Sequence, residues 1–466
     1  MTAVAELDVT NPATGERIGT IPRGDDAVVD DVVRAAQAAQ REWRRLPLAE
    51  RATLVSRLAD VLDAHGEELA RLDAIDNGSP ISCFREDVGV AAWALRYFAG
   101  LVLEQKGETL PADGDRLNFT LRQPYGVVAR ITPFNHPVLF AARGAAAPLA
   151  AGNAVVIKPS EHTSLSTLRF AELAAEVLPE GLVGVVTGLG GEAGAAVVRH
   201  PAVNRIGFTG SVAGGQAVLA TAASAGVKHV TCELGGKNPL VIMPDADLDE
   251  AVAGAIKGMN FTWSSQSCGS TSRVLVQREI HDPFVERLAA AVAALRPGSP
   301  LDEATTMGAL VNRAQHEKVQ RYIEIGREQG AAEVVRGGPI AVPDHEHGLF
   351  VRPALFDGVA PDSRLAQEEI FGPVLSVLTF EDLDDAVRIA NGVRYGLTAG
   401  IFTRDLGAAL RFARDVEAGY VWVNDSATHI PGASFGGWKA SGMGREEGFE
   451  ELLSYGQTKN VNVRFG

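Results

Sequence analysis

Apolar residues in the first quarter of the chain recur every three or four positions, the spacing of helices that pack on one side. One such stripe runs through residues 28–36, with charged residues facing away from it, and a second runs through 54–62. The second helix is expected to end near Gly66 and a third near Gly78, where glycine and a following proline stop a helix. The chain therefore opens with a helical segment.

From about Gly126 onward, short continuous apolar runs alternate with helical segments. Strands that are apolar throughout are typical of a parallel sheet covered on both faces. The expected strands are 126–131, 154–157, 184–186, 205–208 and 229–232, and the helices between them lie near 165–177 and 212–225.

A second series of the same kind begins near Pro239 and continues to about Ser441. Its first elements are expected to be a strand at 240–243, a helix from 247, a strand at 273–276 and a helix near 282–295. No internal repeat or low-complexity linker separates the two series. The change near Gly235 therefore indicates two α/β domains that pack closely together.

The most apolar long stretch of the chain runs from residue 138 to 157. It contains Arg143, Pro148, Gly152 and Asn153, which a bilayer span would not place together at its centre. We interpret it as a buried helix, a turn and a buried strand.

Composition and charge limit the function classes. The chain has 466 residues, of which 46% are hydrophobic and 22% charged, which excludes a disordered or collagen-like chain. Lysine and arginine total 43 and aspartate and glutamate total 58, so the net charge is −15. Neither nucleic acid nor an anionic membrane is an expected partner, because both attract clustered basic residues.

Cysteine usage indicates the compartment. Only three cysteines occur, Cys83, Cys232 and Cys268. A sparse, odd set does not form a disulfide framework and suits a reducing environment. The first residues are acidic and lack an apolar core, so no signal peptide is expected. A cytoplasmic protein is the resulting prediction.

Two glycine-rich segments are candidates for holding the phosphates of a dinucleotide. Residues 188–193 fit the pattern G-x-G-x-x-A, but no acidic residue follows before Glu233 to hold a ribose. We interpret that motif as a simple turn. The segment 208–215 runs from a strand into a helix, whose free N–H groups and dipole favour an anion. This second signal is weak on its own, since many such turns contain Gly-Ser.

Charged residues follow two of the expected strands. Lys158 and Glu161 come after the strand 154–157, where open α/β sheets bind ligands, and could contact ribose hydroxyls. Glu233 follows the strand 229–232 and could act as a general base. For each of these residues, an ordinary charged surface position is the alternative.

Cys268 lies in the small, polar sequence QSCGS, whereas structural cysteines are usually surrounded by bulky apolar residues. It is a candidate nucleophile, with a structural role as the alternative. Cys232 in a strand and Cys83 in a helical segment are expected to be packing residues.

Asn135 lies between Pro133 and Pro137, which would hold its amide rigidly, as a donor to an oxyanion requires. A rigid turn is the alternative. No cluster of His, Cys, Asp or Glu has metal-ligand spacing, so no metal is expected. The P-loop motif of nucleotide hydrolases does not occur.

Eight motifs together carry more information than any one of them. They are NPATGE at 11–16, PFN at 133–135, KPSE at 158–161, FTGS at 208–211, ELGGK at 233–237, QSC at 266–268, EIFGP at 369–373 and FGGWKASG at 435–442. In this order they resemble the aldehyde dehydrogenase superfamily along nearly the whole chain.

The resemblance implies an enzyme that oxidises an aldehyde to the carboxylic acid, with hydride transfer to NAD or NADP. Cys268 is the implied nucleophile, Glu233 the general base, and Asn135 an oxyanion donor beside the backbone N–H of Cys268. The implied cofactor-binding residues are Thr132, Phe134, Lys158, Glu161, Gly210, Ser211, Gly235, Glu369 and Phe371. The implied substrate-pocket residues are His136, Phe140, Arg143, Thr262, Trp263, His429 and Phe435.

Glu161 favours NAD over NADP, because a carboxylate that accepts from both ribose hydroxyls repels a 2′-phosphate. Two other functions compete with aldehyde oxidation to the acid. One is a CoA-acylating aldehyde dehydrogenase, which typically lacks a base at the position of Glu233. The other is a non-catalytic scaffold of the same fold, against which intact Cys268, Glu233 and Asn135 argue.

The implied fold is α/β and has three parts. Residues 1–106 and 126–234 would form a Rossmann-like dinucleotide-binding domain, and residues 235–445 an α/β catalytic domain. Residues 107–125 and 446–466 would form a small β element that joins a hairpin near 116–123 to a C-terminal strand at 459–464. This element would assemble the chain into a homodimer or homotetramer.

Several positions depart from the usual pattern of the family. The helix over 138–149 often carries a lysine near its middle, but this chain has Arg143 and Gly144, which puts a proton relay through that lysine in doubt. Its usual partner, Glu446, is present. Gln457 stands where a glutamate is common, and Ser434 where a proline is common. The chain is also expected to lack the usual strand before residue 11.

Overall fold

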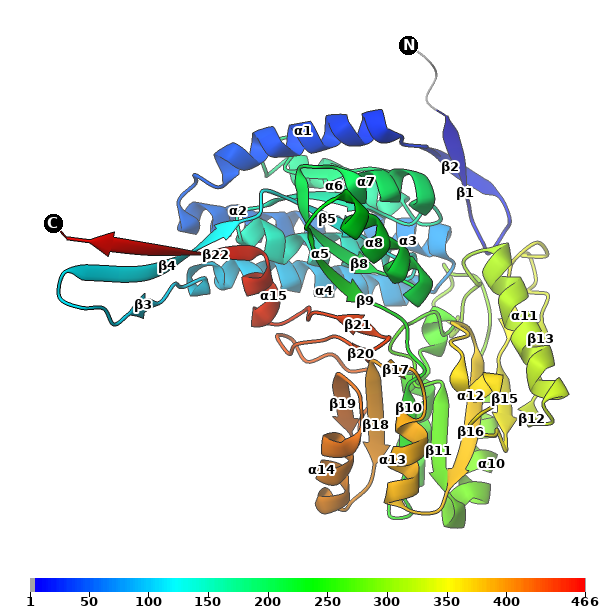
Figure 1. The fold of residues 1–466 in the computed structure, drawn as a ribbon. Coiled ribbons are helices and arrows are strands. Elements are labelled where there is room, and N and C mark those ends of the chain that lie inside the picture. Colours follow the sequence, from blue (N-terminus) through cyan, green and yellow to red (C-terminus); the bar gives the residue numbers. More distant parts are fainter. Residues whose placement is uncertain (1–4, 466) are drawn as a thin grey trace.

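Two open sheets with helices packed on them form most of the molecule (Figure 1). The computed structural model describes residues 5–465 of the chain. Within that range no helix is both long and apolar enough to cross a bilayer. The predicted α/β fold class is confirmed.

The first sheet has the strand order β21-β9-β8-β5-β6-β7, and only β21 is antiparallel to its neighbour. Its strands are β5 (Val127–Ile131), β6 (Ala154–Lys158), β7 (Val183–Val185), β8 (Val203–Thr209), β9 (His229–Glu233) and β21 (Gly442–Met443). The order reverses between β5 and β8, and ligands of such sheets bind at the carboxyl ends of the strands near that reversal. The five strands expected from apolar runs are all present.

The helices around this sheet include the expected helical opening of the chain. They are α1 (Asp26–Trp43), α2 (Leu48–Ala64), α3 (Gly66–Asn77), α4 (Ile81–Gly100), α5 (Pro137–Ala150), α6 (Leu165–Ala175), α7 (Ala195–Arg199) and α8 (Val212–Ala225). The first begins where the side chain of Asp25 accepts two backbone N–H groups. The third ends at Gly78, whose φ of 93° is left-handed.

These helices divide between the two faces of the sheet, as right-handed crossovers require when the strand order reverses. α5 and α6 connect β5 to β6 and β6 to β7 and lie on one face, where α2, α3 and α4 pack against them. α7 and α8 lead into and out of β8 on the other face, and α1 contacts α7 and the sheet. The stretch 138–157 is the predicted buried helix, turn and strand.

The expectation that no strand precedes residue 11 is wrong. β1 (Glu6–Thr10) pairs antiparallel with β2 (Arg17–Pro22) across the turn that contains Gly15. Leu7 and Val9 are turned inward, whereas the polar residues that alternate with them, Glu6, Asp8 and Thr10, are exposed. This alternation is the ordinary pattern of a half-buried strand and was present in the sequence.

The second sheet has the order β12-β15-β16-β11-β10-β18-β19, and only β12 is antiparallel. Its strands are β10 (Pro239–Ile242), β11 (Arg273–Gln277), β12 (Ala332–Val335), β15 (Ala354–Asp357), β16 (Val374–Phe380), β18 (Thr398–Phe402) and β19 (Tyr420–Val423). The helices around it are α9 (Leu248–Gly258), α10 (His281–Ala293), α11 (Arg313–Glu328), α12 (Arg364–Gln367), α13 (Leu383–Asn391) and α14 (Leu406–Asp415).

Alternate residues of β10 enter different cores, which shows that both faces of this sheet are buried. Leu240 and Ile242 belong to the core that contains α9 and α10, whereas Val241 belongs to the core that contains α11 and α13. The strand positions expected at 240–243 and 273–276 are confirmed.

A third, three-stranded sheet projects from the body of the molecule (Figure 1). It has the order β22-β4-β3, formed by β3 (Thr109–Leu110), β4 (Arg116–Pro124) and β22 (Gly456–Arg464), which follows α15 (Phe449–Ser454). The predicted pairing of residues near 116–123 with the C-terminal strand is confirmed. Short strands complete the structure: β13 (Gly338–Pro339), β14 (Val351–Arg352), β17 (Tyr395–Gly396) and β20 (Trp438–Lys439).

Candidate active site

A cavity of about 630 Å³ brings the two candidate catalytic residues Glu233 and Cys268 together. Glu233 is the last residue of β9 in the first sheet, and Cys268 lies in the loop before β11 of the second. The cavity is also lined by residues of α4 and α5 and by the loop around Pro431. Residues far apart in the sequence thus meet where the two α/β units face each other.

The loop that carries Cys268 is tightly constrained. Asn260, Ser264 and Ser265 have left-handed backbone conformations, with φ of 53°, 50° and 56°. The side-chain amide of Asn238 donates to the carbonyl oxygen of Cys268 at 2.8 Å and to that of Ser270 at 3.0 Å. Sequence reasoning missed Asn238, whose only signal was its place directly after the ELGGK motif.

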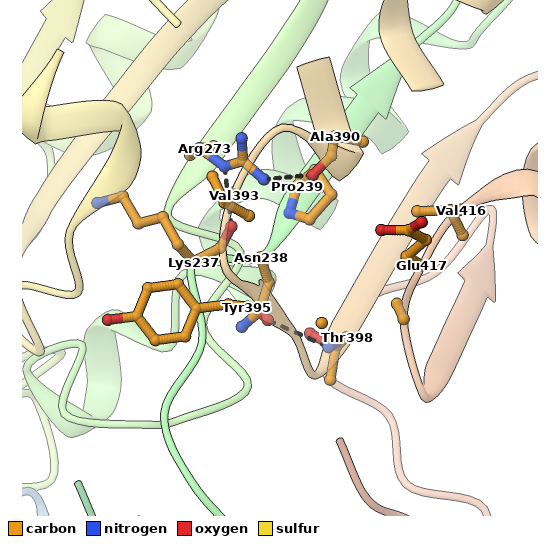
Figure 2. Close-up of a pocket in the computed structure, with 12 residues that line it drawn as sticks. Lys237, Asn238, Pro239, Arg273, Ala390, Val393, Tyr395, Thr398, Val416 and Glu417 are labelled. Atoms are coloured by element: carbon orange, nitrogen blue, oxygen red, sulfur yellow. Dashed lines mark hydrogen bonds between the residues drawn. The ribbon is translucent and has the colours of Figure 1, made fainter. Parts of the chain in front are cut away.

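Asn238 is itself anchored in the second sheet, because its amide oxygen accepts from the backbone N–H of Thr398 at 3.1 Å (Figure 2). Beside it, the buried Arg273 donates to the carbonyl oxygens of Lys237, Ile389 and Ala390. Lys237 is buried, and burial lowers the pKa of its ammonium group to about 7. These contacts make the floor of the Cys268 loop rigid.

The three cysteines differ in their access to the cavity. Cys268 is half-buried and lines it, whereas Cys83 and Cys232 are buried in α4 and β9. Burial and the nearby carboxylates Glu369 and Glu233 raise the pKa of Cys268 to about 12. The thiol is therefore neutral at rest and must lose its proton when it attacks.

Glu233 lines the same cavity and is the candidate base. Both of its carboxylate oxygens are buried without a hydrogen-bond partner among residues 5–465. Burial and the negative charge of Glu446 raise the pKa of Glu233 well above its usual value. A carboxyl group with a raised pKa is a stronger base near neutral pH than an ordinary glutamate.

Asn135 lies in the rigid turn between β5 and α5. The turn is held by Asn77 and Thr163, whose side chains donate to the carbonyl oxygen of Phe134 at 2.8 and 3.2 Å. Asn135 is buried, and its amide oxygen has no partner among the described residues. The next residue, His136, lines the cavity and pairs with Asp87 at 2.9 Å, but Asn135 does not appear in the cavity wall.

The carboxyl end of β6 presents two of the implied cofactor residues. Nζ of Lys158 lies 3.3 Å from a carboxylate oxygen of Glu161. Although burial opposes it, the charge of Lys158 lowers the pKa of Glu161, so the carboxylate is ionised. Directly after the neighbouring strand β5, Thr132 is buried with its hydroxyl oxygen unpartnered.

At the carboxyl end of β8, Gly210 leads into Ser211, which caps α8 by accepting from the N–H of Gly214 at 3.1 Å. The helix begins one residue later and offers its first N–H groups to an anion. By contrast, residues 188–193 follow the edge strand β7, and Glu192 there forms an ion pair with Arg23.

Two further implied cofactor residues, Glu369 and Phe371, precede β16 of the second sheet. Glu369 accepts from the N–H of Gly236 at 3.1 Å, and a Cβ at Gly235 would overlap its carboxylate. Phe371, with a left-handed φ of 60°, packs edge-on against Phe134 at 5.6 Å. An unpartnered hydroxyl, a helix start and two carboxyl groups, of which Glu161 is ionised, fit a dinucleotide with two riboses.

Six of the seven implied pocket residues line the cavity, namely His136, Phe140, Arg143, Trp263, His429 and Phe435. Thr262 does not line it and is exposed. It is the middle residue of a single 3₁₀ turn (Phe261–Trp263) in which Trp263 takes the inward position. Aromatic residues of other elements that sequence reasoning missed are Trp93, Phe98 and Trp422.

The departures from the family pattern have distinct surroundings. Glu446 forms its ion pair with Arg130, at 2.7 Å, while Arg143 bonds Glu447 at 2.5 Å. Gln457 is exposed on β22, opposite Gln123 of β4. No group of acidic, histidine and cysteine side chains able to hold a metal occurs within residues 5–465.

The sequence model described as the aldehyde dehydrogenase family matches residues 2–461. The chain belongs to the aldehyde dehydrogenase family. It is 44% identical over 466 residues to aldehyde dehydrogenase tropH of Talaromyces stipitatus, covering 98% of this chain and 90% of the relative. It is 43% identical to betaine aldehyde dehydrogenase of Mesorhizobium japonicum, with 99% and 94% covered. The implied family and activity, oxidation of an aldehyde to the acid, are thereby confirmed.

Solved structures of aldehyde dehydrogenases share the fold. The NAD⁺ complex of the aldehyde dehydrogenase from Bacillus cereus superposes with a TM-score of 0.95 at 38% identity, covering 99% of this chain and 94% of the other. The NAD-dependent aldehyde dehydrogenase from Sinorhizobium meliloti gives 0.95 at 40% identity, with 99% and 92% covered. The first of these structures contains NAD⁺ and the second protein is NAD-dependent, in agreement with the predicted NAD cofactor.

Proposed function

We propose that this aldehyde dehydrogenase uses NAD, with Cys268 as nucleophile and Glu233 as general base. The observation that carries the proposal is that these two side chains line one cavity. The carboxyl ends of β5, β6 and β8, which would hold the dinucleotide, belong to the same sheet as Glu233. Lys158 and Glu161 would hold one ribose, Ser211 and the start of α8 the pyrophosphate, and Glu369 the other ribose. Thr132, Phe134, Gly210, Gly235 and Phe371 would complete the binding surface.

The chemistry begins at the thiol. The sulfur of Cys268 bonds to the aldehyde carbon as its proton is released to solvent water, and the resulting alkoxide is held by the amide of Asn135 and the backbone N–H of Cys268. A bound nicotinamide supplies the hydride acceptor. Cys268 is then acylated as a thioester.

Hydrolysis of the thioester returns the enzyme to its starting state. Glu233 takes a proton from a water molecule, whose oxygen bonds to the acyl carbon. The carbon–sulfur bond breaks, the sulfur recovers a proton, and the carboxylic acid leaves. Glu233 thus favours water over CoA as acyl acceptor, since this residue lines the cavity that would contain the thioester and its carboxylate has no partner among residues 5–465.

The charges that line the cavity indicate which class of aldehyde would bind there. Its wall contains the carboxylates Glu86, Asp87, Glu233, Glu446 and Glu447, but Arg143 is the only lysine or arginine among its lining residues. Arg143 is already bonded to Glu447, so a carboxylate on the substrate would find no free cation. The remaining wall is mainly aromatic and aliphatic. We infer an aldehyde that carries no negative charge, aromatic aldehydes included.

Assembly and compartment are also proposed. The projecting sheet exposes Leu110, Leu117 and Leu121, which suits a contact between copies in a homodimer or homotetramer. It would join residues 107–125 to the C-terminal segment from residue 446. Residues 1–106 together with 126–234 would form the dinucleotide-binding domain, and residues 235–445 the catalytic domain. Three unpaired cysteines support a cytoplasmic location.

Absorbance of NADH with a panel of aldehydes, with and without CoA, tests the reaction. CoA-independent NADH formation that is lost in Cys268→Ser supports the proposal, and strict CoA dependence contradicts hydrolysis. Benzaldehyde against 4-carboxybenzaldehyde tests the substrate class, with kcat/KM expected to be at least about tenfold higher for benzaldehyde. Preference for the carboxylate would contradict the inferred class alone.

A further inference from the structure

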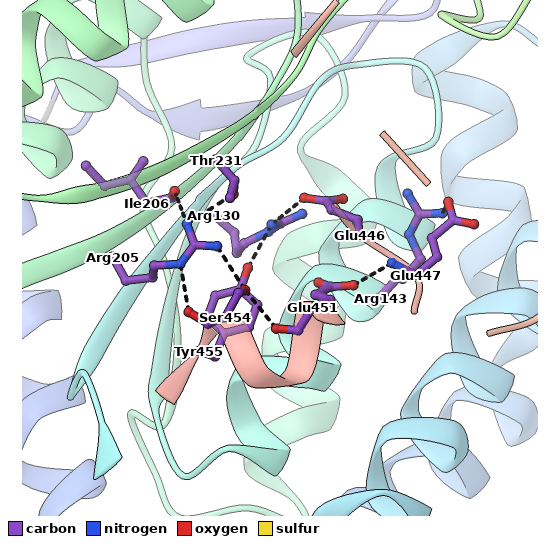
Figure 3. A network of polar contacts seen from close by, with 10 residues as sticks. All are labelled: Arg130, Arg143, Arg205, Ile206, Thr231, Glu446, Glu447, Glu451, Ser454 and Tyr455. Atoms are coloured by element: carbon purple, nitrogen blue, oxygen red, sulfur yellow. Dashed lines mark hydrogen bonds and ion pairs between the residues drawn. The ribbon is translucent and has the colours of Figure 1, made fainter. Parts of the chain in front are cut away.

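Glu446 lines the active-site cavity with Glu233 and Cys268, and a buried arginine of the first sheet holds it (Figure 3). Nη1 of Arg130, on β5, donates to a carboxylate oxygen of Glu446 at 2.7 Å and to the hydroxyl of Tyr455 at 2.9 Å. The side chains of Arg130 and Glu446 are only 2% and 4% exposed. Water therefore does not screen this pair.

Two glycines make the space that the guanidinium occupies. A Cβ at Gly144 of α5 would lie 2.8 Å from Nε of Arg130, and one at Gly207 of β8 would overlap Nη1. The family often has a lysine near the middle of this helix as the partner of Glu446. Here the helix has glycine, and the cation reaches Glu446 from the adjacent strand.

The carboxylate of Glu446 lies among several charged or titratable groups. Those near Glu446 or Glu233 are Arg130, Arg143, Arg445, Glu447, Glu451 and, through Tyr455, Arg205. Although burial opposes it, the charge of Arg130 lowers the pKa of Glu446, with Arg143 adding to the effect. Glu446 is therefore a carboxylate at neutral pH, and its charge acts on Glu233.

Residues of the C-terminal segment also hold Arg130 in place, through the hydroxyl of Tyr455. Tyr455, which follows α15, is fully buried, and Arg205 stacks on its ring with 4.7 Å from the guanidinium carbon to the ring centre. Arg205 also donates to the hydroxyl of Ser454 at 3.1 Å. The position of Arg130 is thus fixed by β5, β8, α5 and α15 together.

We propose that Arg130 is a positioning residue that holds Glu446 as a carboxylate beside Glu233, in the place where the family often uses a lysine of α5. The inference rests on the proposed function, because it takes Glu233 as the base. A lysine can give up its proton, but a guanidinium stays protonated in proteins. Arg130 therefore holds Glu446 without exchanging a proton with it.

Arg130→Met removes the cation and tests this role. We expect steady-state kcat to fall about 10- to 100-fold, because the base loses its fixed neighbour. The NADH burst of the first turnover should persist, and the Kd for NAD, measured by protein fluorescence, should stay unchanged. The pH midpoint of thioester hydrolysis should move lower, since a protonated Glu446 no longer raises the pKa of Glu233. A merely structural role would leave that midpoint in place.

The double variant Arg130→Met/Gly144→Lys restores the pattern that the family often shows. A lysine at 144 meets no guanidinium in this background and can reach toward Glu446. We expect it to recover most of the lost kcat and the original pH midpoint. A folded double variant no better than Arg130→Met would overturn the proposal, as would Arg130→Met with unchanged kcat.

Gly144→Ala keeps every charge and displaces the guanidinium by steric overlap alone. Gly100→Ala is the matched control, because it lies at the end of α4 with nothing within 4 Å of an added Cβ. We expect about a tenfold lower kcat for Gly144→Ala and no change for Gly100→Ala. This pair decides the question if Arg130→Met does not fold, and equal turnover of the two variants would contradict the proposal.

Glu233→Gln distinguishes an incorrect assignment of the base from an incorrect role of Arg130. If Glu233→Gln keeps full turnover, the proposed base is wrong and the inference about Arg130 falls with it. If Glu233→Gln is slow but the Arg130 and Gly144 variants turn over like wild type, only the inference is wrong.

Discussion

The side-chain amide of Asn238 donates a hydrogen bond to the carbonyl oxygen of Cys268, with 2.8 Å between the two atoms. The same amide bonds Ser270 and, through its oxygen, Thr398 of the second sheet. The backbone of the nucleophile is thus tied to β18 of the second sheet. The position of the sulfur, and of the backbone N–H proposed for the oxyanion, depends in part on this side chain.

Asn238→Ala should lower kcat/KM by about 10- to 100-fold, because the loop with Cys268 loses its anchor and small displacements of a reacting group are costly. Buried carbonyl groups also lose their donor, at about 1–3 kcal/mol of stability. Steady-state kinetics and thermal unfolding measure the two effects. Asn204→Ala, an exposed asparagine on β8, is the matched control, and similar activity of both variants would contradict the anchoring role.

Glu161→Gln should weaken the preference for NAD over NADP, raising kcat/KM for NADP about tenfold, because a neutral amide no longer repels a 2′-phosphate. Kinetics with both cofactors and fluorescence titration of each measure the change. Glu192→Gln is the control: it lies in the glycine motif at 188–193, pairs with Arg23, and should leave both cofactors unaffected. Altered NAD binding in Glu192→Gln, with none in Glu161→Gln, would reverse the two assignments.

The sequence allowed the α/β class, five of the six strands of the first sheet and the partners of the third sheet to be predicted. Apolar runs such as 154–157 are buried on both faces, and that requirement is visible in any single strand. The family motifs located Cys268 and Glu233, which the structure places in one cavity. By contrast, β1 was missed although Leu7 and Val9 alternate with polar residues, because a two-stranded ribbon has only a short pattern.

Contacts between distant segments could not be derived from local patterns. The residues near Gly144 in the sequence do not indicate that Arg130 of another element occupies the space beside this glycine. Likewise, the residues near Asn238 do not indicate that its side chain holds Cys268. Thr262 was assigned to the pocket by its position in the chain, but the turn around it directs Trp263 inward instead. Such outcomes depend on which of several side chains occupies a given space in the folded molecule.

Alkylation of Cys268 by iodoacetamide should rise about tenfold per pH unit from about pH 7 to about pH 10, because the reactive thiolate is a minor species well below the thiol pKa. Burial and nearby carboxylates raise the pKa of Cys268 to about 12, so no plateau should appear in that range. Mass spectrometry of the labelled peptide measures the rate, with Cys268→Ser as the background. A plateau near neutral pH would show a stabilised thiolate instead.

Pre-steady-state NADH formation by Glu233→Gln tests the proposed mechanism most directly. If Glu233 activates water for thioester hydrolysis, the variant should release about one equivalent of NADH per active site in a burst and then turn over about 10²–10⁴-fold more slowly than wild type. Loss of the burst as well would assign Glu233 to deprotonation of Cys268 too, which the alkylation rate of the variant would confirm. Wild-type steady-state turnover, with hydrolysis still limiting, would show that Glu233 is not the base.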